Sequence, residues 1–260
     1  MIPPSAVLPA LALLAAHALV DFVVQNERDV REKAALRPLA FVRHGAQHAL
    51  AAWILVGVVS AWTIPLAVFG AHVTIDAAKE LARRRVRGDA TGLRLFTLDQ
   101  IAHIASIVAI AALLGASLGP SSWETWIGRE TWTTALIVAT GLIVAVRTGA
   151  IVVALGVRRF QRDLDEAEPA DTIRTEPRGL SGGGAMIGAL ERALVFFFVL
   201  TGMPQAVGFL LAAKSILRFG DLNARQQRVE TEYVIIGTLA SFAWALATAW
   251  LTTRALAHFG

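Results

Sequence analysis

The chain has 260 residues, of which 55% are hydrophobic and 17% are charged. A soluble domain of this length normally carries about 25% charged residues, so the composition is typical of a membrane protein. The net charge of +4 does not indicate a nucleic-acid partner, because the basic residues lie in short segments between apolar blocks, as cytoplasmic loops do. Cysteine is absent, which excludes disulfides, thiolate metal sites and cysteine nucleophiles.

Eight apolar segments are predicted to cross the membrane as helices. In chain order they cover residues 6–25, 39–60, 61–79, 98–118, 131–157, 184–203, 204–219 and 233–254. The first has no Lys or Arg ahead of it, so it is interpreted as a retained span rather than a signal peptide. The sixth and seventh are divided at Gly202-Met203-Pro204, because 184–219 as one helix would be too long for a hydrocarbon core of about 30 Å.

The distribution of basic residues supports this division. With eight spans and both termini outside, every Lys and Arg except Arg129 and Arg254 falls on the cytoplasmic side, as the positive-inside rule expects. The sequence therefore predicts an all-α polytopic bundle of about eight transmembrane helices, with its long loops in the cytoplasm. Residues 161–183, which are rich in acidic residues, are predicted to be a cytoplasmic linker. It would divide a five-span part, residues 1–160, from a three-span part, residues 184–260.

Each of the first four spans carries two polar residues spaced four apart. Such residues share one face of a helix, and the alternating direction of the spans puts all four pairs at similar depth in the cytoplasmic half. Ionisable groups inside a membrane are costly and usually face a bundle interior or a wet cavity. The pairs are His17 with Asp21, His44 with His48, His72 with Asp76, and Asp99 with His103.

Imidazole and carboxylate groups are standard zinc ligands and also suit iron or manganese. The sequence predicts a divalent metal, zinc first among these, held by His44, His48, His72, Asp76 and Asp99. Asp21, His17 and His103 are predicted to act as general base or to orient the ligands, and Lys79 to stabilise developing negative charge. The alternative is a set of hydrogen-bonded interfacial residues, in which Asp99 only caps its helix.

Further charged residues lie toward the cytoplasmic ends of the later spans. Arginine offers a planar fork of donors that suits phosphate or carboxylate. The four predicted substrate- or anion-binding residues are Arg147, Arg192, Lys214 and Arg218. Ordinary pairing of charges at helix ends is the stronger of the two interpretations for this group.

The polar pairs belong to longer runs, namely Ala16-His17-Ala18-Leu19-Val20-Asp21-Phe22-Val23-Val24-Gln25, then His44 and His48, then His72-Val73-Thr74-Ile75-Asp76-Ala77-Ala78-Lys79, then Asp99-Gln100-Ile101-Ala102-His103. This combination resembles a bacterial membrane family known only as a domain of unknown function (DUF3307-type), over about residues 1–118. The segments Leu190-Glu191-Arg192, Ala213-Lys214-Ser215 and Glu232-Tyr233 resemble the extension that often follows it. The resemblance implies a bacterial inner membrane and no known activity.

The leading functional hypothesis is a metal-dependent hydrolase that acts at the cytoplasmic leaflet on a lipid or lipid-linked substrate. A looser likeness to membrane-bound metal-dependent hydrolases favours it by analogy. The alternative is an ion, metal or proton-coupled transporter that uses the same cluster, although the outer halves of the spans carry almost no charge. A third hypothesis is a non-catalytic scaffold whose basic loops bind anionic lipid. Membrane lipid and a second copy of the chain are the expected partners.

Overall fold

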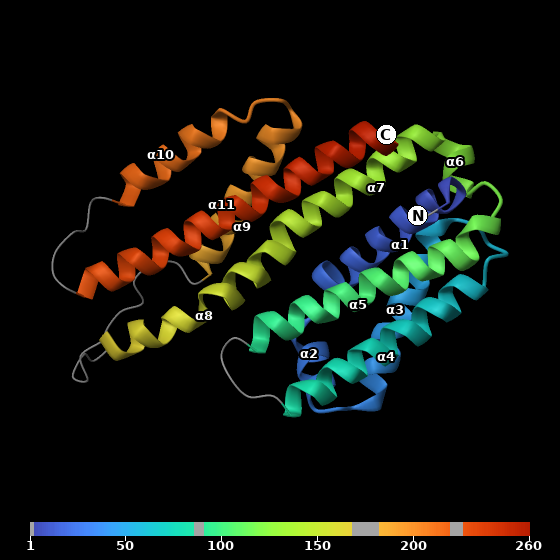
Figure 1. The fold of residues 1–260 in the computed structure, drawn as a ribbon, viewed down its shortest axis with the longest axis horizontal. Coiled ribbons are helices and arrows are strands. Elements are labelled where there is room, and N and C mark those ends of the chain that lie inside the picture. Colours follow the sequence, from blue (N-terminus) through green and yellow to red (C-terminus); the bar gives the residue numbers. More distant parts are fainter. Residues whose placement is uncertain (1–2, 86–90, 168–181, 219–225) are drawn as a thin grey trace. The chain divides into compact units, whose positions relative to one another are not determined.

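The computed structural model describes residues 3–85, 91–167, 182–218 and 226–260. These residues are predominantly helical and contain no strand (Figure 1). The long helices are α1 (Val7–Leu19), α3 (Pro38–Val56), α4 (Thr63–Arg85), α5 (Thr91–Leu114), α7 (Arg129–Ile143), α8 (Gly149–Ala167), α9 (Gly183–Leu200), α10 (Ala206–Arg218) and α11 (Gln226–Phe259). Shorter elements are η1 (Pro4–Ala6), η2 (Val20–Val24), α2 (Glu27–Ala34), η3 (Gly115–Ser117), α6 (Ser122–Ile127) and η4 (Val144–Thr148).

The prediction of an all-α membrane bundle is confirmed, and a helix occupies each of the eight segments expected to span. The predicted break at Gly202-Met203-Pro204 is also present, because α9 ends at Leu200 and α10 begins at Ala206. Five helical stretches among the described residues are long and apolar enough to cross a membrane. They are Pro4–Val24, Gly92–Ser117, Arg129–Arg158, Gly183–Leu200 and Thr231–Phe259. The number of eight spans is therefore not confirmed.

The chain forms two compact units, residues 1–143 with 255–260 (unit 1) and residues 144–254 (unit 2). Most of the predicted linker, residues 168–181, lies outside the described residues, so the predicted domain boundaries stay predictions. In unit 2, Val195 of α9, Val207 of α10, and Phe242 and Ala245 of α11 form an apolar core.

Unit 1 is built around α1, which packs against α3, α5 and α7, while α4 packs against α3 and α5. The contact surfaces carry small side chains, and Ala12, Ala52 and Ala111 are almost completely buried. Small residues let membrane helices approach closely. The central position of α1 means that polar groups on it face other helices rather than the surroundings of the bundle.

The last turn of the first helix is a π-helix, η2, and it carries Asp21. Such turns are often found at functional sites because they redirect side chains from the regular helical register. Gln25 is then extended, and α2 starts at once with a capping box. In it Asp29 N donates to Asn26 Oδ1 at 3.0 Å, and Asn26 N donates to Asp29 Oδ2 at 3.4 Å. Helix α2 consequently turns across the bundle and contacts α3 and α4.

Candidate metal centre

Polar side chains from the first four long helices meet inside unit 1. The structure brings together all nine residues that the sequence predicts for the metal and its chemistry, and adds Lys33 of α2. Most of these side chains are buried, with His44 and His48 at 0% and 2% exposure. We call this group the His/Asp cluster: His17, Asp21, Lys33, His44, His48, His72, Asp76, Lys79, Asp99 and His103.

Asp21 is the point on which the imidazoles of α3 and α4 converge. Its Oδ1 lies 2.9 Å from Nε2 of His44, 3.0 Å from Nε2 of His48 and 3.6 Å from Nε2 of His72. Ligands about 2.0–2.2 Å from a tetrahedral zinc lie about 3.3–3.6 Å from one another. The Nε2 atoms of His44 and His48 are 3.2 Å apart. Only the 3.6 Å distance falls in that range, and His44 and His48 lie at hydrogen-bond distance from Asp21, but all four ligand atoms lie within 4.8 Å of one another and so could hold one metal ion.

Several polar atoms of the cluster have no hydrogen-bond partner among the described residues. They include Nε2 of His72, Nε2 of His103 and Oδ1 of Asp99, all buried. An unsatisfied buried polar atom costs about 1–3 kcal/mol. The ring of His72 also stacks between those of His48 and His103, with centroids 3.5 Å and 4.2 Å away. A bound cation would satisfy His72, so the residues present fit a divalent metal.

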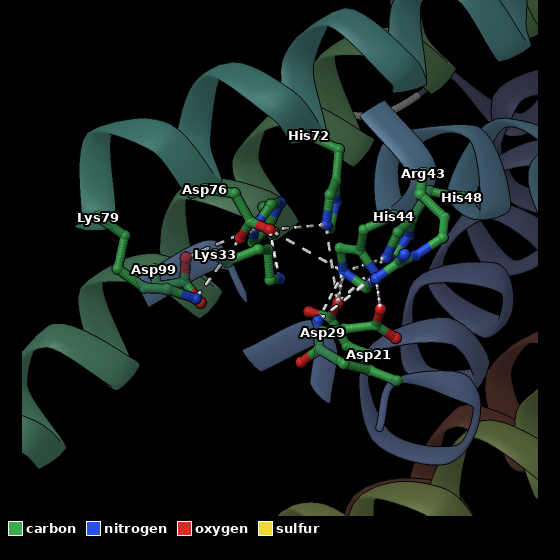
Figure 2. A network of polar contacts seen from close by, with 12 residues as sticks. Asp21, Asp29, Lys33, Arg43, His44, His48, His72, Asp76, Lys79 and Asp99 are labelled. Carbon is green, nitrogen blue, oxygen red and sulfur yellow. Dashed lines mark hydrogen bonds and ion pairs between the residues drawn. The ribbon is translucent and has the colours of Figure 1, made fainter. Parts of the chain in front are cut away.

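Asp76 and Asp99 have cationic partners of their own. Lys33 Nζ lies 2.6 Å from Asp76 Oδ2, and Lys79 Nζ lies 3.1 Å from Asp99 Oδ2 and 3.4 Å from Asp76 Oδ1. His103 Nε2 is 3.5 Å from Asp99 Oδ1 and 3.7 Å from Asp76 Oδ1. Figure 2 shows these ion pairs on one side of His72 and the Asp21 group on the other.

The formal charges of the cluster favour one cation at Asp21. Three aspartates are matched by only two lysines, and both lysines contact Asp76 or Asp99. Asp21 has only imidazoles within ion-pair distance among the described residues. A buried carboxylate without a matching positive charge is strongly unfavourable. The Asp21 side chain is 11% exposed, so a cation bound there would offset a largely desolvated negative charge.

Helix α2 covers one end of the cluster through ion pairs. Besides Lys33, its buried Asp29 accepts from Arg43 of α3, which also lies 3.0 Å from Glu32. Hydrogen bonds from Arg28 and Arg43 lower the pKa of Glu32 below its ordinary value. Arg84 Nη2 donates to the Ala34 carbonyl at 3.2 Å.

Lys33 lies in a predicted cytoplasmic loop, between the predicted spans 6–25 and 39–60, and is not among the predicted site residues. The only signal for it was the capping pattern of Asn26 and Asp29, which predicts a short helix at this position. Nothing in that pattern indicates which way the helix turns, so the partner of Lys33 could not be inferred.

Two of the four predicted anion-binding residues, Lys214 and Arg192, have contacts that explain them structurally. Lys214 Nζ lies 2.6 Å from Glu191 Oε2. Arg192 is buried, and its Nε donates to the Val146 carbonyl of the π-helical turn η4 at 3.1 Å. Arg147 is exposed, and the side chain of Arg218 lies outside the described residues. Anion binding by this group stays a prediction, and these contacts favour charge pairing and carbonyl capping.

Comparison with known families agrees with the resemblance seen in the sequence. Residues 10–134 match the model of a family described as "Protein of unknown function (DUF3307)". The match includes every member of the His/Asp cluster and ends before the C-terminal segments, whose resemblance stays a prediction. No curated protein and no solved structure matches the chain. Over residues 10–134, just under half of the chain, this protein is therefore similar to the DUF3307 family, a domain of unknown function.

Proposed function

We propose that this protein is a metal-dependent hydrolase of a bacterial inner membrane, acting at the cytoplasmic leaflet on a lipid or lipid-linked substrate. The observation that carries the proposal is the convergence of Nε2 of His44, His48 and His72 on Oδ1 of Asp21. Zinc suits three imidazoles and a carboxylate best, and iron or manganese also suit them. With these four residues as ligands, water would occupy a fifth coordination position, where the metal would lower its pKa and so supply a nucleophile near neutral pH.

In this proposal Asp21 is a ligand, and the neighbouring residues orient it. His17 Nδ1 lies 3.8 Å from Asp21 Oδ2, while its Nε2 lies 3.2 Å from Gln100 Oε1. A partner on the second ring nitrogen fixes the orientation of an imidazole. Gln100 therefore orients the ring of His17, which lies within ion-pair distance of Asp21 and would take the place of an orienting residue beside the metal site.

Lys79 and His103 are assigned to the substrate. Lys79 is the more accessible of the two cluster lysines, because its side chain is 25% exposed and that of Lys33 is 5% exposed. Its ammonium would stabilise negative charge that develops on a phosphoryl or carbonyl oxygen. His103, held beside Asp76 and Asp99, would receive or return the proton. In this proposal Asp76 and Asp99 position Lys79 and His103, and they are not metal ligands.

The test begins with the metal content of the purified full chain. We expect about one zinc, iron or manganese per chain by elemental analysis, and loss of most of it in His48→Ala. His258→Ala is the matched control, because His258 is exposed on α11 and lies outside the cluster. Wild-type protein without metal, whose thermal stability is unchanged by a chelator, would contradict the metal centre.

Hydrolysis is tested on the metal-loaded protein with vesicles that contain phospholipid and isoprenoid phosphates, followed by mass spectrometry of the products. Lys79→Met should lower turnover about 100-fold or more, the size of effect expected for one charge-stabilising group, while the metal content is retained. A metal-loaded protein that releases no product from these lipids would leave a metal centre without the proposed activity.

A further inference from the structure

A cavity of about 260 Å³ opens at the end of unit 1 away from α2. It lies among the start of α1, the ends of α3 and α5, and α6. Its lining combines apolar side chains with polar ones that the sequence analysis did not place in any site. The polar contributors are Ser5, Ser121, Glu124 and Arg129, and the last two are ion-paired at 3.5 Å.

A second cavity, of about 20 Å³, lies directly against the His/Asp cluster. Its wall includes His17, His48, His72 and His103, together with Ser106. This volume suffices for about one water molecule, provided that polar partners are available. Nε2 of His103, which is not one of the proposed metal ligands, has no hydrogen-bond partner among the described residues, so it can supply such a contact.

The two cavities follow each other along the same three helices. On α1 the large cavity is lined by Pro9 and Ala12, and the small one by Leu13 and Ala16. On α3 the lining passes from Val56 to Ala52, and at the end of the next helix it passes from Gly115 of η3 to Ile110 of α5. These steps correspond to about one helical turn, or about 5.4 Å.

The partition between the cavities is made partly of small side chains. Ala12, Ala52 and Ala111 are at 0–1% exposure and belong to the same apolar core as Leu13, Ile64 and Ile107; Ala12 lines the large cavity and Ala52 the small one. Alanine offers little bulk to close a passage, and membrane passages are often lined by small residues and backbone rather than by charges. The outer halves of the predicted spans carry almost no charge, which counts against transport. A passage lined by small side chains and backbone would nevertheless be compatible with that lack of charge.

We propose that α1, α3 and α5 enclose a water route from the 260 Å³ cavity to the His/Asp cluster. Water and protons would reach His72 and His103 from the α6 end, while Lys33 and the other ion pairs of α2 close the opposite end. The route goes beyond the proposed hydrolase, since it does not depend on which reaction the cluster performs. It would supply the water that hydrolysis consumes, and it is also what ion or proton transport through this cluster would require.

Hydroxyl-radical footprinting of the full chain in lipid nanodiscs tests the route, because radicals formed from water modify the side chains beside that water. Leu13 and Ile110 line the small cavity, whereas Leu113, on the same helix as Ile110, is 79% exposed on the outside of α5. We expect Leu13 and Ile110 to be modified at least 10-fold faster than the lipid-facing Leu113. Equal rates would overturn the proposal.

A second experiment fills the 260 Å³ cavity with a bulky side chain and so tests whether the water enters through it. Leu118→Trp places bulk in the large cavity, which Leu118 lines, and Leu113→Trp is the matched control on the lipid side. Leu118→Trp should slow the modification of Ile110 at least five-fold, and Leu113→Trp should not. An unchanged rate in a folded Leu118→Trp protein would overturn the route from this end. Metal content is measured separately on the same samples. If they contain no metal, the proposed metal centre is contradicted, but the footprinting result still decides whether the water route exists.

Discussion

Lys33 and Asp76 form a buried ion pair between a short peripheral helix and the centre of the bundle. The Nζ and Oδ2 atoms are 2.6 Å apart, although 43 residues separate them in the chain, and their side chains are only 5% and 3% exposed. The pair joins α2 to α4 and matches the charge of Asp76, whose Oδ2 also lies 3.7 Å from Nε2 of His72 and 3.9 Å from Nε2 of His44. It thus affects both the stability of unit 1 and the choice of metal ligands.

Lys33→Met is expected to destabilise the protein strongly. Removing one partner of a buried pair leaves an uncompensated charge and costs about 3–5 kcal/mol. Arg31→Met is the control on the same helix, because Arg31 is 71% exposed and its ion pair with Glu27 is worth at most about 1 kcal/mol. Thermal unfolding in detergent measures both. Adding Asp76→Asn to Lys33→Met should restore part of the stability, since the orphaned charge is removed, and a double variant less stable than Lys33→Met would contradict this account.

Asp21→Asn and Asp76→Asn separate the proposed metal ligands from their neighbours. Asp21 has three imidazole Nε2 atoms within 3.6 Å, whereas Asp76 has Lys33 and Lys79 within 3.4 Å. We expect Asp21→Asn to weaken zinc binding at least 100-fold, as loss of a charged ligand does, and Asp76→Asn to weaken it less than 10-fold. Competition with a metal-sensitive dye gives both constants. The reverse order would restore Asp76 to the ligand set that the sequence predicts.

Gly57 and Gly70 should respond in opposite directions to alanine. Gly57 ends α3 with φ of 69°, and a Cβ there would lie 2.5 Å from Cδ1 of Trp123. Alanine at Gly57 should therefore cost about 1–3 kcal/mol of stability, because the left-handed conformation and the close contact both oppose a side chain. Gly70 is exposed within α4, and a Cβ there meets nothing within 4 Å. Alanine at Gly70 should be neutral or stabilise by about 0.5–1 kcal/mol. Unfolding midpoints of the two variants compare them directly.

The orientation of the chain is open to cysteine labelling, because the protein has no cysteine of its own. Single cysteines in 161–183 and 220–230 should react with a membrane-impermeant maleimide only after the cell is permeabilised. Cysteines in 200–206, between α9 and α10, should react in intact cells, since the basic residues of the loops keep to the cytoplasmic side. Labelling of 220–230 in intact cells would refute the eight-span topology, because residues 184–219 would then cross the membrane once rather than twice.

The sequence was sufficient to predict the helical membrane class and the membership of most of the cluster. Both follow from local properties, namely the length of apolar segments and the spacing of polar residues along a helix. His72 and Asp76, four residues apart, must share a face of α4 wherever that helix packs. The resemblance to the DUF3307 family rests on the same spacings, which is why it was visible without a structure.

The tertiary structure decided which atoms of the cluster meet. The π-helical turn η2 directs Asp21 into the group of His44, His48 and His72, and the turn of α2 delivers Lys33 to Asp76. The larger cavity arises where the ends of α1, α3 and α5 separate beside α6. The local pattern names no tertiary partner for any of these features, because each depends on how the helices of unit 1 pack against one another. Helix periodicity determines which side chains share a face, and only packing determines what that face meets.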